Sequence, residues 1–145
     1  MPSVRPHCYV GPVRPTCTHV ALEAADVDRS VAFYRTHVGL EPIHRRREHD
    51  TDVVWLGEPE RPDALVIVLI ETPQAASKPH PMAHLGYAVE SRAKVDEAAA
   101  RGRAAGVEVS GPVDAGGVVG YYCLLADPDG NWIEFSFGQS LGEQP

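Results

Sequence analysis

The chain has 145 residues, of which 43% are hydrophobic, and this suits one globular domain with its own core. The formal charge of −7 argues against nucleic acid or an anionic membrane surface as a partner. No apolar run reaches the ~18 residues that span a bilayer. The first 15 residues also lack the apolar stretch of a signal peptide, so the sequence predicts a cytoplasmic protein.

The first half of the chain is predicted to form a strand, a helix and three further strands. Residues 1–15 contain four prolines and are expected to form an extended arm. From Cys17 to Glu23 apolar and polar residues alternate, which is typical of a half-buried strand with His19 on its less apolar face. Asp26 can cap the helix and Gly39 can end it. Three strands should follow, at 41–47, 52–56 and 64–71, and the arginines at 45–47 suit an exposed edge.

The same order of elements recurs in the second half. A strand is expected at 82–89, and Ser91 can cap a helix that Gly106 ends. Strands near 107–109, 118–126 and 131–137 should follow, and the Asp-Pro-Asp-Gly sequence at 127–130 predicts the last turn. The sequence therefore predicts an α+β domain at 16–138, built from two β-α-β-β-β modules at 16–72 and 82–138, with a tail at 139–145.

Potential metal ligands recur with the same period. His19 and His84 stand 65 residues apart, each early in its module, while Glu71 and Glu134 stand 63 residues apart, each in a late apolar strand. Such a period indicates a duplicated structural unit. Two imidazoles and two carboxylates suit one divalent ion, namely Zn²⁺, Ni²⁺, Co²⁺, Mn²⁺ or Fe²⁺. The alternatives are structural histidines and, for Glu71 at the end of its strand, a solvated carboxylate.

The arrangement resembles the vicinal oxygen chelate superfamily over about residues 16–138. The motifs that carry the resemblance include His19-Val20-Ala21-Leu22, Ala83-His84-Leu85, and Asp127-Pro128-Asp129-Gly130-Asn131-Trp132-Ile133-Glu134. It implies that the two modules form a curled mixed sheet around a central metal cleft, with the helices outside. It also implies three ligands, His19, His84 and Glu134, and Glu71 matches the fourth ligand of glyoxalase I. Members commonly dimerise and some share the cleft between two chains, so a homodimer is expected.

The resemblance implies a glyoxalase-like lyase or isomerase whose metal ion binds two adjacent oxygens of a small substrate. Glu134 is the leading candidate to move a proton, with Glu71 as its symmetric partner. Tyr122 and Glu23 are candidate substrate contacts, although Tyr121 competes with Tyr122 because the orientation of that strand is open. Glu23 also stands where bacterial glyoxalase I has a glutathione-binding arginine, so a glutathione hemithioacetal is not the expected substrate.

Three alternatives stay open from the sequence. An extradiol dioxygenase would use Fe²⁺ with the ligands His19, His84 and Glu134. A transferase like the fosfomycin-resistance proteins would need a basic, anion-binding cleft. A protein like the bleomycin-sequestering members would bind a small molecule without catalysis, and such members typically lack the metal ligands.

Overall fold

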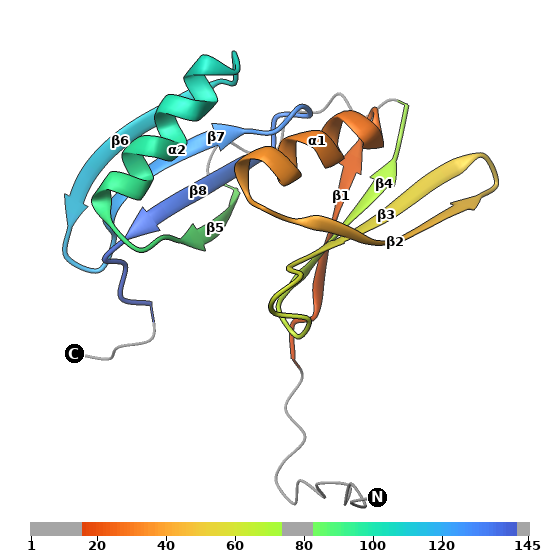
Figure 1. Cartoon of the computed structure of the whole chain (residues 1–145), viewed down its shortest axis with the longest axis horizontal. Coiled ribbons are helices and arrows are strands. Elements are labelled where there is room, and N and C mark those ends of the chain that lie inside the picture. The colour runs from red at the N-terminus through yellow and green to blue at the C-terminus, as the bar shows by residue number, and fades with distance from the viewer. Residues whose placement is uncertain (1–15, 74–82, 142–145) are drawn as a thin grey trace, which may run out of the picture.

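The computed structural model describes residues 16–73 and 83–141, so the predicted arm and the end of the predicted tail lie outside the described residues. The predicted α+β fold of two β-α-β-β-β modules is confirmed (Figure 1). The first module consists of β1 (His19–Ala24), α1 (Val27–His37), β2 (Glu41–Glu48), β3 (Thr51–Gly57) and β4 (Val66–Glu71). The second consists of β5 (His84–Ala88), α2 (Arg92–Ala104), β6 (Val109–Gly116), β7 (Gly120–Ala126) and β8 (Trp132–Phe137).

Each module has its own four-stranded mixed sheet. The strand order is β1-β4-β3-β2 in the first sheet and β5-β8-β7-β6 in the second. The first and last strands of a module, β1 with β4 and β5 with β8, run parallel, and the other pairs are antiparallel. The arginine-bearing β2 is an exposed edge strand, as predicted. The strands β1 and β5, which carry His19 and His84, are also edges of their sheets.

Both helices begin and end where the sequence predicts. The side chain of Asp26 accepts a hydrogen bond from the backbone N–H of Arg29 at 3.0 Å, and Ser91 caps α2 in the same way. Gly39 and Gly106 follow the helices with φ of +82° and +73°, a conformation that glycine adopts without a steric penalty. Neither described helix is long and apolar enough to cross a membrane.

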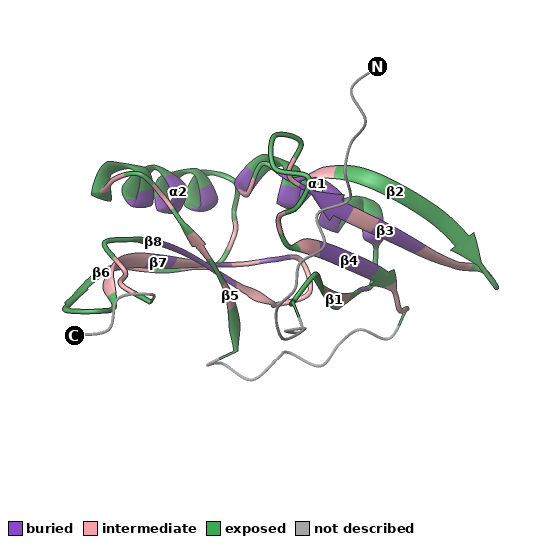
Figure 2. Cartoon of the chain, turned by 90° about the horizontal axis from the view of Figure 1, so that it is seen from below, coloured by how far each residue is buried: buried purple, intermediate pink, exposed green. Residues whose placement is uncertain are grey.

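The core lies between the helices and one face of each sheet. Alternate strand residues point toward the helices and join one continuous apolar cluster that spans both modules. Figure 2 shows the buried faces of α1 and α2 turned toward the sheets, whereas β2 is exposed along almost all of its length. The strand members of the cluster are Ala24, Val54, Leu56, Ile67, Leu69, Cys123, Leu125, Ile133 and Phe135. The opposite face of each sheet, turned away from the helices, is called the open face below.

The β6–β7 hairpin differs from the prediction. The sequence pattern suggested a short strand at 107–109, but β6 runs from Val109 to Gly116. A register shift between Ser110 and Val113 carries the strand past the intervening Gly-Pro pair. Proline is tolerated at a bulge in an edge strand, and β6 is an edge strand.

Polar contacts join the two modules on the helix side. The predicted turn at 127–130 connects β7 to β8, and its two aspartates bind the first module. The Tyr34 hydroxyl donates to Asp127 at 2.7 Å, and the Ser30 hydroxyl donates to Asp129 at 3.1 Å. The backbone N–H of Ala25 also donates to Asp129, at 2.9 Å. These residues form an inter-module clasp between α1 and the β7–β8 turn.

Candidate metal centre

The strand register brings His84 and Glu134 together on the open face of the second sheet. His84 lies opposite Trp132 and Gly86 lies opposite Glu134, so the histidine and the glutamate are diagonal neighbours on adjacent strands. The distance from His84 Nε2 to Glu134 Oε2 is 3.4 Å. Glu134 is only 6% exposed, and a buried carboxylate needs a partner to offset its desolvation.

The spacing of these two groups fits ligation of one metal ion. Metal bonds of about 2.0–2.2 Å to nitrogen and oxygen separate two ligand atoms on the same ion by about 3.0–3.5 Å. The His84–Glu134 distance of 3.4 Å falls in this range and is longer than the most common N–H···O hydrogen bond. An imidazole nitrogen beside a carboxylate oxygen is also a donor pair that divalent transition metals favour.

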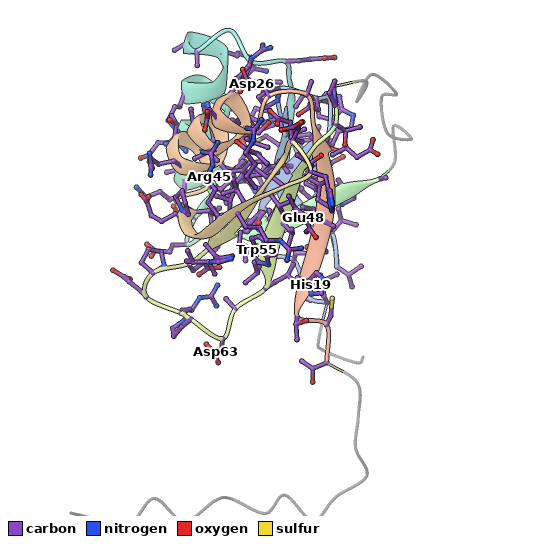
Figure 3. All side chains as sticks on the ribbon, turned by 90° about the vertical axis from the view of Figure 1, so that its right-hand side faces the viewer. His19, Asp26, Arg45, Glu48, Trp55 and Asp63 are labelled. Atoms are coloured by element: carbon purple, nitrogen blue, oxygen red, sulfur yellow. The ribbon has the colours of Figure 1, made fainter. Side chains whose placement is uncertain are left out.

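His19 occupies the corresponding position in the first module. It begins β1 opposite Val66, as His84 begins β5 opposite Trp132, and its side chain is exposed on the open face (Figure 3). Its Nδ1 lies 3.0 Å from the hydroxyl of Thr18. Within residues 16–73 and 83–141 of one chain, no three His, Cys, Asp or Glu side chains gather around a common point that could hold an ion. His19 therefore does not join His84 and Glu134 inside one chain.

Glu71 is not brought to His19 by the fold. The two residues lie near opposite ends of the paired strands β1 and β4, because His19 is opposite Val66 and Glu71 is opposite Ala24. Ala24 belongs to the buried core, so Glu71 extends from the helix-side face of the sheet rather than from the open face. Its Oε2 accepts a hydrogen bond of 3.4 Å from the backbone N–H of Asp52.

Val68, and not Glu71, is the structural counterpart of Glu134. Glu134 is two residues beyond the partner of His84, and Val68 is two residues beyond the partner of His19. The first module therefore presents an apolar side chain where the second presents a carboxylate. The sequence period pairs Glu134 with Glu71, but the positions in the sheets pair Glu134 with Val68, which lies three residues before Glu71.

The structure resolves which tyrosine of β7 shares the face of Glu134. Tyr122 lies opposite Ser136 of β8. Ser136 is two residues from Glu134 and shares its face, so Tyr122 also belongs to the open face. Tyr121 points to the helix side, where its hydroxyl donates to Asp96 of α2 at 2.6 Å. Glu23, the other predicted substrate contact, is exposed on the open face of β1 together with His19.

Gln139 contacts Glu134 and was not anticipated from the sequence. Its side-chain amide donates to Glu134 Oε1 at 3.2 Å. Strand periodicity could not indicate this contact, because Gln139 lies beyond the last strand. The preceding Gly138, which has a φ of +77°, is the one local sign that the chain changes direction there.

Comparison with known proteins identifies the family of the chain. Residues 16–135 match the model of the Glyoxalase/Bleomycin resistance protein/Dioxygenase superfamily. The chain belongs to this superfamily. A member from Pseudomonas aeruginosa, the uncharacterized protein PA2024, is 43% identical over 129 residues, which cover 88% of this chain and 92% of that protein.

Solved structures of superfamily members share the fold at low sequence identity. Glyoxalase I from Leishmania major, described as trypanothione-dependent, superposes with a TM-score of 0.70 at 23% identity, covering 86% of this chain and 87% of the other. The fosfomycin resistance protein FosX from Listeria monocytogenes, in complex with Mn(II) and dihydroxypropylphosphonic acid, gives 0.72 at 20% identity, covering 89% and 96%. These similarities show the fold of this superfamily member. Its reaction depends on its own residues and does not follow from the shared fold.

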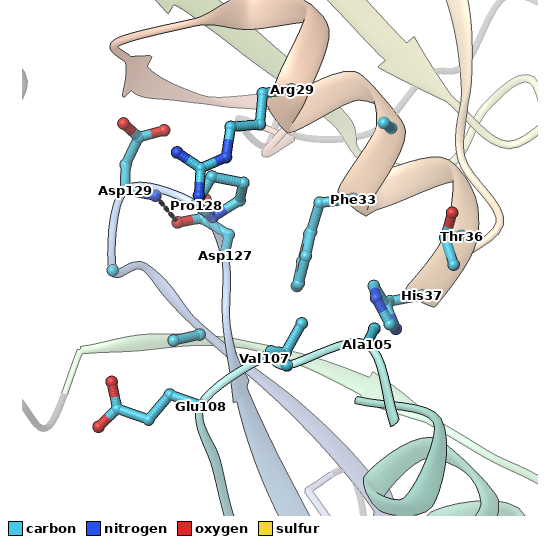
Figure 4. Close-up of a pocket in the computed structure, with 14 residues that line it drawn as sticks. Arg29, Phe33, Thr36, His37, Ala105, Val107, Glu108, Asp127, Pro128 and Asp129 are labelled. Atoms are coloured by element: carbon cyan, nitrogen blue, oxygen red, sulfur yellow. Dashed lines mark hydrogen bonds between the residues drawn. The ribbon is translucent and has the colours of Figure 1, made fainter. Parts of the chain in front are cut away.

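A separate cavity of about 680 Å³ lies on the helix side, away from the open-face residues (Figure 4). It is bounded by α1, by the segment between α2 and β6, and by the β7–β8 turn, and it contains none of the predicted metal ligands. Phe33 and His37 line it and are both buried. Burial, with a further contribution from Arg101, lowers the pKa of His37 below its ordinary value, so its imidazole is neutral at pH 7.

Proposed function

We propose that this superfamily member is a divalent-metal-dependent enzyme that acts, as a homodimer, on a small oxygenated metabolite. The observation that carries the proposal is the pairing of His84 with the buried carboxylate of Glu134 at 3.4 Å on an open sheet face. The ligand set is His19, His84 and Glu134. Glu71 is left out because the register sets it apart from His19.

A dimer is proposed because one chain carries the ligand set in two parts. The second module holds two ligands, and the third, His19, lies on the edge strand of the other sheet. β1 and β5 each form ladder pairs on one side, with β4 and β8 respectively, and such edges favour association with another chain. In a two-fold dimer, His19 of one chain would complete the site of the other, and the reverse contact would build the second site.

A bound divalent ion would supply Lewis acidity toward two neighbouring oxygens of the substrate. The residues of the chain would then orient the substrate and move protons. Glu134 is suited to carry a proton at Oε2, the oxygen beside His84, while its Oε1 is held by Gln139. The Tyr122 hydroxyl, on the same face, is suited to hydrogen-bond the substrate. Glu23 places a negative charge on the open face of β1, which disfavours a glutathione carboxylate there.

The proposed reaction is of the lyase or isomerase type, in which a proton moves between adjacent carbons or oxygens. A second candidate reaction is favoured because Val68, which cannot bind a metal ion, occupies the first-module position that corresponds to Glu134. A set of three protein ligands resembles the fosfomycin-resistance enzymes and extradiol dioxygenases more than a glyoxalase I with four. The second candidate is therefore a transferase like the fosfomycin-resistance proteins, or an Fe²⁺-dependent extradiol dioxygenase, that uses the same ligands.

The test is elemental analysis of the purified full chain, with His84→Ala and His49→Asn prepared in parallel. His49 lies in an exposed turn with a φ of 48°, which asparagine tolerates, so it is a matched control. We expect about one divalent ion per chain in the wild type and the control, and its loss in His84→Ala. Iron would favour ring cleavage, whereas Ni, Co, Zn or Mn would favour the other reactions. A wild type that neither contains metal nor shows a thermal shift with added metals would contradict the proposal.

The shared site has its own test. Co-refolding His19→Ala with His84→Ala chains produces mixed dimers in which one of the two sites has all its ligands. If the site is shared between chains, about a quarter of the metal-binding capacity should return, because half of the dimers are mixed and each has one intact site. If each chain builds its own site, the mixture should bind as little metal as either variant alone.

A further inference from the structure

The chain reverses direction directly after β8 and returns toward Glu134. Gln139 follows Glu134 by five residues, which in a continuing strand would place it about 16 Å away. Gly138, with its φ of +77°, turns the backbone at this point. The backbone N–H of Ser140 then donates to the carbonyl of Val118 at 3.0 Å, which fixes the returning segment to the turn between β6 and β7.

The close approach of this segment depends on Gly120 at the start of β7. A Cβ atom on Gly120 would clash with the carbonyl oxygen of Phe137 and would lie 3.0 Å from the backbone nitrogen of Gln139. Residues with side chains cannot occupy this position without moving the backbone of the returning segment. The absence of a side chain at Gly120 and the turn at Gly138 together bring the amide of Gln139 within reach of Glu134.

Gln139 meets Glu134 in a defined orientation. The amide nitrogen donates to Glu134 Oε1 at 3.2 Å, and the amide oxygen lies 3.5 Å from the hydroxyl of Ser136. An ionised carboxylate can only accept hydrogen bonds, so the nitrogen of the amide must face it. The other carboxylate oxygen, Oε2, is the one that lies beside His84. The two oxygens of Glu134 therefore have different partners.

We propose that Gln139 is a positioning residue that holds Oε1 of Glu134 and thereby turns Oε2 toward His84 and a bound metal ion. The inference rests on the proposed function and extends it to a residue outside the ligand set. Without the amide, the carboxylate would be free to rotate about its terminal torsion, which has broad minima. Hydrogen bonds to the distal oxygen of a carboxylate ligand commonly fix its orientation and strengthen metal binding.

The experiment is a Co²⁺ titration of the metal-free full chain, followed by visible absorption. Four chains are compared: the wild type, Gln139→Met, Ser136→Ala and Leu141→Ala. Methionine keeps the length and much of the volume of glutamine but cannot donate a hydrogen bond. Leu141, which is 84% exposed, is the control for substitutions in the same segment. Thermal unfolding of each metal-free chain shows whether the fold itself has changed.

We expect Gln139→Met to bind Co²⁺ about 10- to 100-fold more weakly and to shift the ligand-field absorption bands, with little change in unfolding temperature. Ser136→Ala should have a smaller effect in the same direction, and Leu141→Ala none. If wild type and Gln139→Met bind Co²⁺ with the same affinity and spectrum, the positioning role is wrong while the metal site stands. If the wild type does not bind Co²⁺ at all, both the metal site and the role of Gln139 are wrong.

Discussion

The hydroxyl of Tyr34 donates a 2.7 Å hydrogen bond to the carboxylate of Asp127, which lies 93 residues further along the chain. Burial and the neighbouring carboxylate raise the pKa of Tyr34, so the phenol stays protonated and acts as a donor. The other oxygen of Asp127 accepts from the backbone N–H groups of Asp129 and Asn131, at 2.9 and 2.8 Å. One buried carboxylate therefore both shapes the β7–β8 turn and joins it to helix α1.

Replacing Tyr34 with phenylalanine should destabilise the protein. The substitution leaves the ring in the core but removes a buried donor to a charged group, so we expect the free energy of unfolding to fall by about 1.5–3 kcal/mol. Tyr121→Phe is the matched control, because it removes a similar hydrogen bond to Asp96 in an exposed position. Urea unfolding of both variants measures the difference. Equal losses would mean that burial of the clasp adds no stability.

Glu71→Gln should leave metal binding unchanged, whereas Glu134→Gln should abolish it. In the pairing of β1 with β4, His19 is opposite the first residue of β4 and Glu71 is its last residue. The side chain of Glu71 also extends from the helix-side face, whereas His19 is on the open face. Metal content after reconstitution with Co²⁺ measures both variants. Loss of the metal in Glu71→Gln would contradict this prediction and would support the four-ligand site that the sequence pattern suggested.

Val68→Glu should create a fourth ligand at the position that matches Glu134. Val68 is only 6% exposed, so the new carboxylate should lower the unfolding temperature of the metal-free protein. Added Co²⁺ should then raise that temperature more than it does in the wild type, because the ion offsets the buried charge. Val68→Gln is the control, since it has a similar shape without the charge. If Co²⁺ raises the unfolding temperature of both variants equally, Val68 is not the structural counterpart of Glu134.

Stability should fall with decreasing pH in a way that depends on His37. Because burial lowers the pKa of His37 in the folded state, the unfolded chain takes up a proton first as pH falls through the ordinary value of 6.5. More protons are then bound by the unfolded state, so the free energy of unfolding decreases. His37→Gln should flatten this decrease between about pH 7.5 and 5.5, the window around an ordinary histidine. Above that window the pH dependence of the two proteins should coincide, and an unchanged slope within it would exclude His37 as the source.

Much of the fold could be predicted because its determinants are local. Asp26 and Ser91 cap the helices through contacts three residues away, and Gly39 and Gly106 end them by their own backbone conformation. Glu134 alternates along β8 with the core residues Ile133 and Phe135, so its face also follows from the period of the strand. Each of these features depends on residues within one helical turn or on the period of one strand.

The site was harder to predict because it depends on register between strands. The sequence period aligned Glu71 with Glu134, but the pairing of β1 with β4 aligns Val68 instead. Alternation fixes which face a residue takes within its strand, and it does not fix how far one strand slides along the next. The contact of Gln139 similarly depends on a turn beyond the last strand, for which periodicity carries no information.

The inter-module clasp and the open face share no side chain, and this separation has an evolutionary consequence. The contacts of Tyr34 and Asp127 that hold the modules together lie on the helix side, so they impose no constraint on the residues around His19 and His84. Substitutions on the open face can therefore alter which molecule is accommodated while the architecture persists. The difference between Val68 and Glu134 illustrates such divergence inside a single chain, where two copies of one unit keep the same order of elements and present different chemistry.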